Sequence, residues 1–192
     1  WLTVGITDGD TAGALSSIGI EWDTWTADSG LSTDNGAVFW MSPDNGPSGS
    51  AVLAQITVAA GSGGTVTMGA QGRSASGDDW SDAGILFALG GGGGGGSSTG
   101  GVNCDATVTA MDSLDGWETY QLGLTLTNGA ANIYTIFGDS STSLTAPAAY
   151  QEAAPFGANT GGVSPAFVAV SATAAVDSWL TVGITDGDTA GA

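Results

Sequence analysis

Apolar and polar side chains alternate along much of this chain. Residues 120–126 show the alternation most clearly, and it recurs at 52–58, 65–68, 18–22 and 2–6. Because successive side chains of a strand point to opposite faces of a sheet, a period of two predicts strands with one face buried. We therefore expect a chain dominated by half-buried β-strands.

Three unbroken apolar runs, at 37–41, 85–87 and 167–170, predict strands in the middle of the core. Turn sequences such as DNG, PDNGP and TNGA stand between the predicted strands. About ten short strands with no stretch of helical period predict an all-β fold. We expect an antiparallel two-sheet β-sandwich, jelly-roll or immunoglobulin-like, with less than about a tenth α-helix.

The two ends of the chain carry the same sequence. Residues Trp1–Ala14, WLTVGITDGDTAGA, recur letter for letter as Trp179–Ala192, an offset of 178 positions. Repeats of this length are whole domains, because solenoid and propeller units are only about 20 to 50 residues long. The 192 residues are therefore expected to be one tandem-repeat unit plus the opening of the next, a slice of a longer periodic polymer.

The glycine-rich stretch Gly90–Gly101, GGGGGGGSSTGG, predicts a flexible linker. A phosphate-binding loop is excluded there, because no Lys follows the glycines. If the linker separates repeats, residues 102–192 are the N-terminal part of one repeat and residues 1–89 the C-terminal part of its predecessor, so that the unit is cut out of phase. The alternative is that the two parts fold onto one another, as in a circular permutant.

Charge narrows the classes of partner. The chain has one cation, Arg73, no His and 19 acidic residues, which gives a formal net charge of −18. Nucleic acid and anionic membranes are excluded as partners, because binding them requires a basic surface. High ionic strength would screen the repulsion between the carboxylates, which favours an extracellular or cell-surface location. Without His or Lys, and without a Gly-x-Ser-x-Gly motif, we expect no enzymatic activity. The alternative is a pair of carboxylates acting as in glycoside hydrolysis, to which no motif in the sequence points.

Arg73 and Cys104 each have a structural interpretation and an interpretation as a contact between copies. An ion pair of Arg73 with Asp78 or Asp79 would hold the local loop, whereas a contact with a neighbouring copy would use the guanidinium to hold its carboxylate. Cys104 is the only cysteine. It is interpreted as a small buried residue, with an intermolecular disulfide as the alternative.

Several acidic residues in predicted turns are candidate ligands of a calcium ion. Asp8 and Asp10 begin like a calcium-binding loop, but Gly19 stands where a bidentate Glu is needed. Asp112 and Asp115 also supply carboxylate oxygens in a turn-rich sequence. These four residues are candidate Ca²⁺ ligands, and the alternative is that they form turns and face solvent.

Long stretches resemble a known kind of protein. The sequences GWETYQLGLTLTNGAANIYTIFGD, LSSIGIEWDTW, DNGAVFWMSPDNGPSG and AQGRSASGDDW resemble repeat β-domains of large secreted or cell-surface proteins of microscopic algae and planctomycete-type bacteria. The resemblance covers nearly the whole chain apart from the glycine stretch. It implies an extracellular β-rich module and carries no catalytic residues.

Two functions follow as hypotheses. The first is a structural repeat module that polymerises head-to-tail with copies of itself into a filament, sheath or appendage, each end segment completing a sheet of the next unit by β-strand addition. The second is a carbohydrate-binding or adhesive module that recognises glycans, in which Trp22, Trp25, Trp40, Trp80 and Trp117 would supply aromatic faces. The residues predicted to mediate assembly are Trp1, Leu2, Val4, Ile6, Trp179, Leu180, Val182, Ile184, Arg73 and Cys104.

Overall fold

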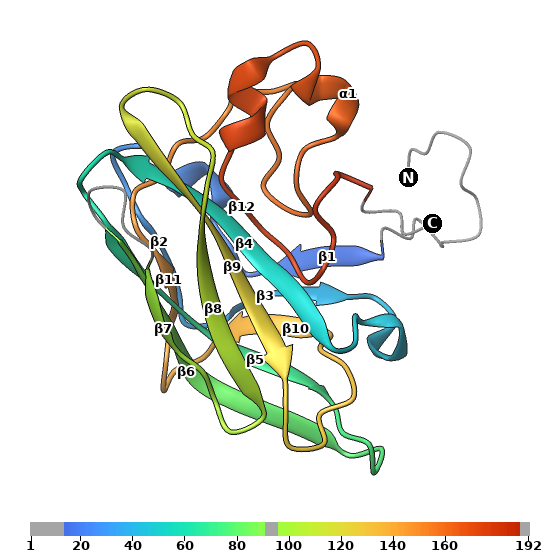
Figure 1. The fold of residues 1–192 in the computed structure, drawn as a ribbon. Coiled ribbons are helices and arrows are strands. Elements are labelled where there is room, and N and C mark those ends of the chain that lie inside the picture. The colour runs from blue at the N-terminus through green and yellow to red at the C-terminus, as the bar shows by residue number, and fades with distance from the viewer. Residues whose placement is uncertain (1–13, 91–95, 189–192) are drawn as a thin grey trace.

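Two antiparallel β-sheets lie face to face in the computed structural model, which describes residues 14–90 and 96–188 (Figure 1). Strand residues make up 47% of the structure and helical residues 9%. The prediction of an antiparallel sandwich with less than a tenth helix is therefore confirmed.

The larger sheet has eight strands arranged around a long central strand. Its members are β1 (Leu15–Ile18), β2 (Leu31–Thr33), β3 (Gly36–Trp40), β5 (Gly64–Arg73), β6 (Asp79–Leu89), β7 (Ser97–Thr99), β10 (Thr135–Gly138) and β11 (Leu144–Ala146). The order is β1-β3-β10-β5-β11-β2, with β6 paired to β5 and β7 paired to β6. The two shorter strands β10 and β11 thus pair with different parts of β5.

The smaller sheet has four strands in the order β12-β4-β9-β8. They are β4 (Ser50–Ala59), β8 (Cys104–Met111), β9 (Trp117–Leu126) and β12 (Trp179–Leu180). The alternating stretches 52–58 and 120–126 lie within β4 and β9, in register at Ile56 and Tyr120. The strands predicted at 65–68, 37–41 and 85–87 correspond to β5, β3 and β6.

The core lies between the two sheets. Its fully buried side chains are mostly branched aliphatic residues, including Val38, Leu53, Ile56, Val66, Ile85, Leu122, Leu124, Ile136 and Leu144. A second, smaller cluster of Val163, Ala174 and Trp179 lies beneath the α1 end of the molecule. The sandwich therefore has a main core and a satellite core on the outer side of the smaller sheet.

Two predicted strands are wrong. The run 167–170 lies in and after α1 (Pro165–Val168), because the hydroxyl of Ser164 accepts a hydrogen bond from the Ala166 N–H and Pro165 occupies the first turn. At 18–22 the strand stops at Ile18, because the chain turns at Gly19 with φ +66°. The other helical segments are 3₁₀ turns at Trp22–Thr24, Pro43–Asn45 and Ala172–Val176.

The glycine-rich stretch joins two neighbouring strands. Residues 97–99, expected to be coil, form β7, which pairs with β6 at Ala88 and Ser97. The hydroxyl of Ser98 also donates to the Ala106 carbonyl of β8 at 2.5 Å. Segments from both sides of the glycine stretch share both sheets, because β4 pairs with β9 and β5 with β10. The two parts therefore fold onto one another within this molecule, whereas their assignment to successive repeats stays a prediction.

Candidate functional site

The first four residues of the C-terminal copy, 179–182, are buried in the sandwich. Trp179 is 3% exposed, and Leu180, Thr181 and Val182 are fully buried. We call the space that holds Trp179–Ile184 the strand slot, and its walls are β4, the loop 159–161 and Trp40.

Backbone hydrogen bonds hold the segment on two sides. On the side of β4, the Thr181 and Gly183 N–H groups donate to the Leu53 and Val52 carbonyls at 2.8 and 2.9 Å. On the opposite side, the Leu180 N–H donates to the Asn159 carbonyl at 3.1 Å, and its own carbonyl accepts from the Gly161 N–H at 3.0 Å. The segment is thus an inserted strand with partners along both edges.

Side chains fix the register of the inserted strand. Leu180 and Val182 belong to the main core, and Ile184 packs against it. Trp179 points into the satellite core. The indole N–H of Trp40 donates to the Val182 carbonyl at 2.7 Å. Since a slip of one residue would turn every side chain to the opposite face, these contacts define a single register.

A buried carboxylate precedes the strand. Asp177 is fully buried and accepts hydrogen bonds from the backbone N–H groups of Glu152, Ala158 and Ser178 at 2.8, 2.7 and 3.0 Å. Burial raises the pKa of Asp177 to about 6, and the three N–H donors oppose that shift. Gln55 donates to the Asp177 carbonyl at 2.8 Å, so that β4 also holds this residue.

The predicted assembly residues are only partly described. Trp179, Leu180, Val182 and Ile184 line up in the strand slot. Their N-terminal counterparts Trp1, Leu2, Val4 and Ile6 lie outside the described residues, as do Asp8 and Asp10.

Arg73 lies at the end of β5, between two carboxylates. Its Nη1 is 2.6 Å from Asp79 Oδ1, and its Nε is 3.1 Å from Asp44 Oδ1. These hydrogen bonds raise the pKa of Arg73. The predicted local ion pair with Asp79 is confirmed, and Asp44 is a partner that the sequence did not indicate.

Cys104 is fully buried at the start of β8. Its thiol donates to Asp82 Oδ2 at 3.6 Å, and burial raises the pKa of the thiol to about 11. Asp82 also accepts from the backbone and side-chain N–H groups of Asn103, at 2.7 and 3.0 Å. The interpretation as a small buried residue is confirmed.

The calcium prediction stays a prediction. Asp112 and Asp115 are exposed between β8 and β9. Within the described ranges no three acidic, Cys or His side chains gather as a metal site. Asp186 and Asp188 have the same sequence context as Asp8 and Asp10, and the Asp188 N–H donates to Asp186 Oδ1 at 3.1 Å, as in an Asx turn.

The five tryptophans do not form one platform. Trp25 and Trp80 are buried, and their indole N–H groups donate to the Pro147 and Asn132 carbonyls at 2.9 Å. Trp22 instead lines a pocket of about 380 Å³ together with Phe156 and Phe167. No sequence pattern links those positions, and so sequence reasoning missed the pocket.

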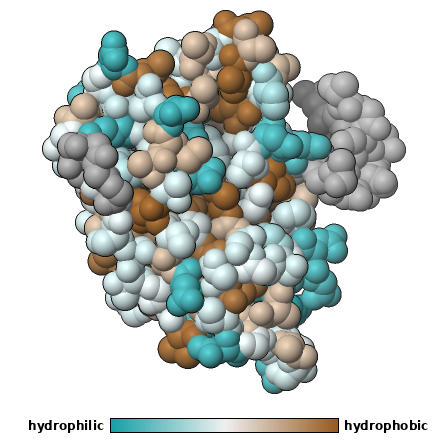
Figure 2. Space-filling view, in the orientation of Figure 1, coloured by the Kyte–Doolittle hydropathy of each residue, from teal (hydrophilic) through white to brown (hydrophobic). Residues whose placement is uncertain are grey.

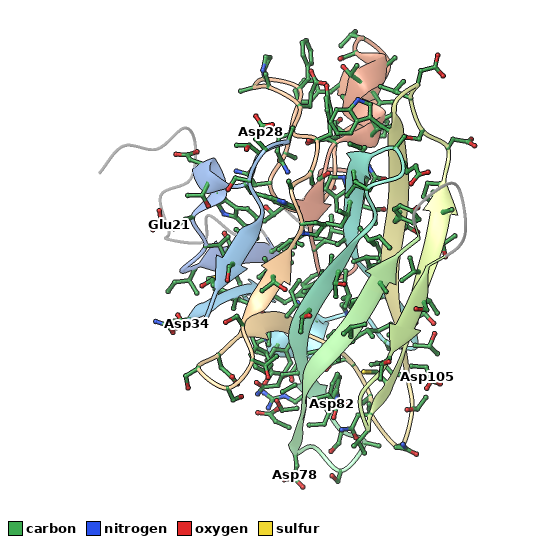
Figure 3. All side chains as sticks on the ribbon, turned by 90° about the vertical axis from the view of Figure 1, so that its left-hand side faces the viewer. Glu21, Asp28, Asp34, Asp78, Asp82 and Asp105 are labelled. Atoms are coloured by element: carbon green, nitrogen blue, oxygen red, sulfur yellow. The ribbon has the colours of Figure 1, made fainter. Side chains whose placement is uncertain are left out.

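Most acidic residues face solvent. Among the labelled residues in Figure 3, Glu21, Asp28, Asp34, Asp78 and Asp105 lie at the periphery. Asp82 and Asp177 are the buried acidic residues in the part of the chain that the structure describes. The molecular surface is therefore strongly negative.

The comparisons identify no relative. No family model, no curated protein and no solved structure matches this chain. None of the described helices is long and apolar enough to cross a membrane. The resemblance to secreted repeat domains thus stays a prediction.

Proposed function

We propose that this protein is a structural module of an extracellular filament, sheath or appendage, and that it assembles by exchanging the strand that fills the strand slot. One observation carries the proposal. The inserted segment Trp179–Ile184, buried at 179–182, is repeated letter for letter at Trp1–Ile6, so that each molecule has one slot and two segments whose sequence matches it.

The N-terminal copy can make the same contacts. The slot recognises the segment through its backbone edges and through the apolar side chains of Trp179, Leu180 and Val182. Each of these features recurs at Trp1, Leu2 and Val4. Insertion of this copy into the slot of a neighbour is β-strand addition, in which main-chain hydrogen bonds supply affinity and alternate side chains supply specificity.

The start of β1 lies near the exit of the slot. The Met41 N–H donates to the Ala14 carbonyl at 2.9 Å, and the adjacent Trp40 donates to the Val182 carbonyl. Residues 7–14, fully extended, reach about 26–29 Å. The N-terminal copy can therefore complete its own slot when the C-terminal copy is absent, or the slot of a neighbour when that slot is empty.

Competition between the two copies determines whether a slot is filled by its own molecule or by a neighbour. The identical strands gain the same contacts, so exchange between molecules changes the total contact energy little. A strand tethered to its own slot has an effective concentration in the mM range, which favours closed molecules in dilute solution. Dense packing of copies favours exchange, which gives chains with a head-to-tail connection.

Three deletion variants test the proposal by size-exclusion chromatography with light scattering at high protein concentration and 1 M NaCl. Removal of residues 1–14 should leave a folded monomer, because its slot is filled and it has no spare strand. Removal of residues 179–192 should leave a folded protein completed by the N-terminal copy. Removal of both should prevent folding.

Point variants of full length supply the matched control. Leu2→Asp places a charge on the strand copy and should abolish association, whereas Thr7→Asp adds the same charge beyond the matching strand and should leave association intact. Equal association of the Leu2→Asp variant and the unchanged protein would overturn the proposal.

A further inference from the structure

A pocket of about 380 Å³ lies between the 3₁₀ turn at Trp22 and the α1 region. This volume lies within the range of about 300–1,000 Å³ that is typical of small-molecule sites. Its walls come from three distant parts of the chain: Trp22, residues 156–167 and Gly187. No residue of the inserted strand lines it, although Asn159 and Thr160 belong to the loop that also forms a wall of the strand slot.

Aromatic rings form one part of the wall. Phe156 and Phe167 meet edge to face, with centroids 5.8 Å apart and planes at 82°. Phe167 is 42% exposed, and the neighbouring Val170 is 72% exposed. In Figure 2 apolar residues gather at the same end of the molecule. The exposed ring of Phe167 offers an apolar face to a ligand at the mouth of the pocket.

Residues with hydrogen-bonding side chains form another part of the pocket wall. Asn159, Thr160 and Ser164 line the pocket. The side chains of Asn159 and Thr160 supply an amide group and a hydroxyl group to the lining. The Ser164 hydroxyl accepts from the Ala166 N–H at 3.3 Å and can still donate.

Close backbone packing fixes the shape of the pocket. A Cβ atom on Gly162 would collide with the Thr185 carbonyl, and one on Gly157 would collide with the Glu152 carbonyl. Both glycines line the pocket. The loops around it thus pack backbone against backbone, which is typical of a preformed site rather than of a loose surface loop.

The lining has no charged side chain. The net charge of −18 also repels anions, and a cation would need carboxylates that the lining does not offer. A neutral ligand with apolar faces and several hydroxyl groups matches aromatic rings flanked by amide and hydroxyl groups. We infer that this pocket binds a neutral sugar ring exposed on a polysaccharide, and that Phe167 and Asn159 contact it.

Binding is tested by affinity electrophoresis of the full chain through gels that contain soluble neutral polysaccharides, namely a β-glucan, a mannan, a xylan and a galactan. At least one should retard the protein. Phe167→Ala and Asn159→Ala should each weaken binding about tenfold. Val170→Ala, at an exposed position two residues after α1 and outside the lining, is the matched control and should bind as the unchanged protein does.

The variant that lacks residues 1–14 separates this inference from the proposed function. It should keep its affinity for the polysaccharide while it loses self-association. A short oligosaccharide from the polysaccharide that retards the protein is then titrated into the protein. NMR should show that the signal of the Trp22 indole N–H shifts during this titration. The inference fails if none of the four polysaccharides binds, or if binding is the same in the Phe167→Ala and Val170→Ala variants.

Discussion

At the scale of single residues, Asp177 has the least ordinary environment. It is fully buried next to the inserted strand, and three backbone N–H groups are directed at its carboxylate. Those donors favour the charged form, but burial has the larger effect and raises the pKa of Asp177 to about 6. The residue thus links the protonation state of the site to the free energy of unfolding.

Stability is expected to fall as the pH rises from about 4 to about 6. Because the pKa of Asp177 in the folded state exceeds its ordinary value of 3.8, the folded protein binds the proton more tightly than the unfolded chain does. The contribution of Asp177 to stability is complete below pH 3.8 and is lost as the pH rises through about 6. Urea unfolding at several pH values measures how steeply the free energy of unfolding depends on pH.

Repulsion among the other carboxylates gives a slope of the same sign, so a variant is needed to isolate Asp177. Asp177→Asn should be less stable at every pH, because its amide nitrogen cannot accept the third N–H, and its slope between pH 4 and 6 should be shallower. An identical slope in both proteins would exclude Asp177 as the source.

Cys104 is expected to react with alkylating reagents only after unfolding. Its thiol is fully buried and its pKa is raised to about 11, so the reactive thiolate is scarce and inaccessible at pH 8. Labelling by iodoacetamide, followed by mass spectrometry, should be complete in denaturant and at least about a hundredfold slower in buffer. Rapid labelling of the folded protein would contradict the buried position.

At the scale of elements, β12 has only two residues, but the segment that begins with it contributes buried side chains to the core. Its two residues pair with Gln55 and Ala54 of β4, and the side chains of Leu180 and Val182 enter the main core. Loss of such a side chain ordinarily leaves a cavity that the surrounding structure does not close.

Leu180→Ala should therefore destabilise the protein by about 2–5 kcal/mol when residues 1–14 are absent. In the full chain the loss should be smaller, because the intact copy at Trp1–Ile6 can take the place of the altered strand. Leu2→Ala in the full chain should change the unfolding free energy little. Denaturant titrations of these three variants and of the two parent proteins, with and without residues 1–14, check this. An equal loss in both parent proteins would show that the copies do not substitute for one another.

At the scale of the whole molecule, the main feature is the large negative charge of the surface. Most of the described acidic side chains are exposed, and Arg73 is already paired with Asp44 and Asp79. The contacts between copies that we propose would therefore lack cations and rely on backbone and apolar groups, while solvent ions would screen the repulsion.

Self-association and thermal stability are both expected to increase when NaCl rises from 10 mM to 1 M, because screening shortens the Debye length from about 30 to about 3 Å. Light scattering and thermal unfolding measure the two effects. Calcium chloride at matched ionic strength is the control for the predicted ligands Asp112 and Asp115. A larger effect of calcium than of sodium would indicate a specific site, whereas assemblies that stay intact in deionised water with chelator would exclude both screening and calcium.

The sequence by itself determined the strands and the character of the surface. Alternation predicted that β4 and β9 are strands, because the two-residue period is a local property of the extended chain. The expectation of one buried face is wrong for β4, where Leu53–Val58 are all buried and a bulge between Val52 and Ala54 interrupts the register. The count of acidic residues predicted the negative surface, whereas the equivalence of the two terminal copies stays a prediction. The same local reasoning failed at 167–170, where the Ser-Pro pair that begins α1 outweighed the apolar run.

Tertiary structure alone decided what the distant segments do together. Only the tertiary structure shows that β6 pairs with β7 across the glycine stretch and that β4 pairs with β12. The alternation of side chains along a strand does not indicate which other strand it will pair with. Asp44 meets Arg73, and Trp22 meets Phe156 and Phe167 around a pocket, for the same reason. Period and composition act over a few residues, whereas a site depends on backbone packing that brings together loops far apart in the chain.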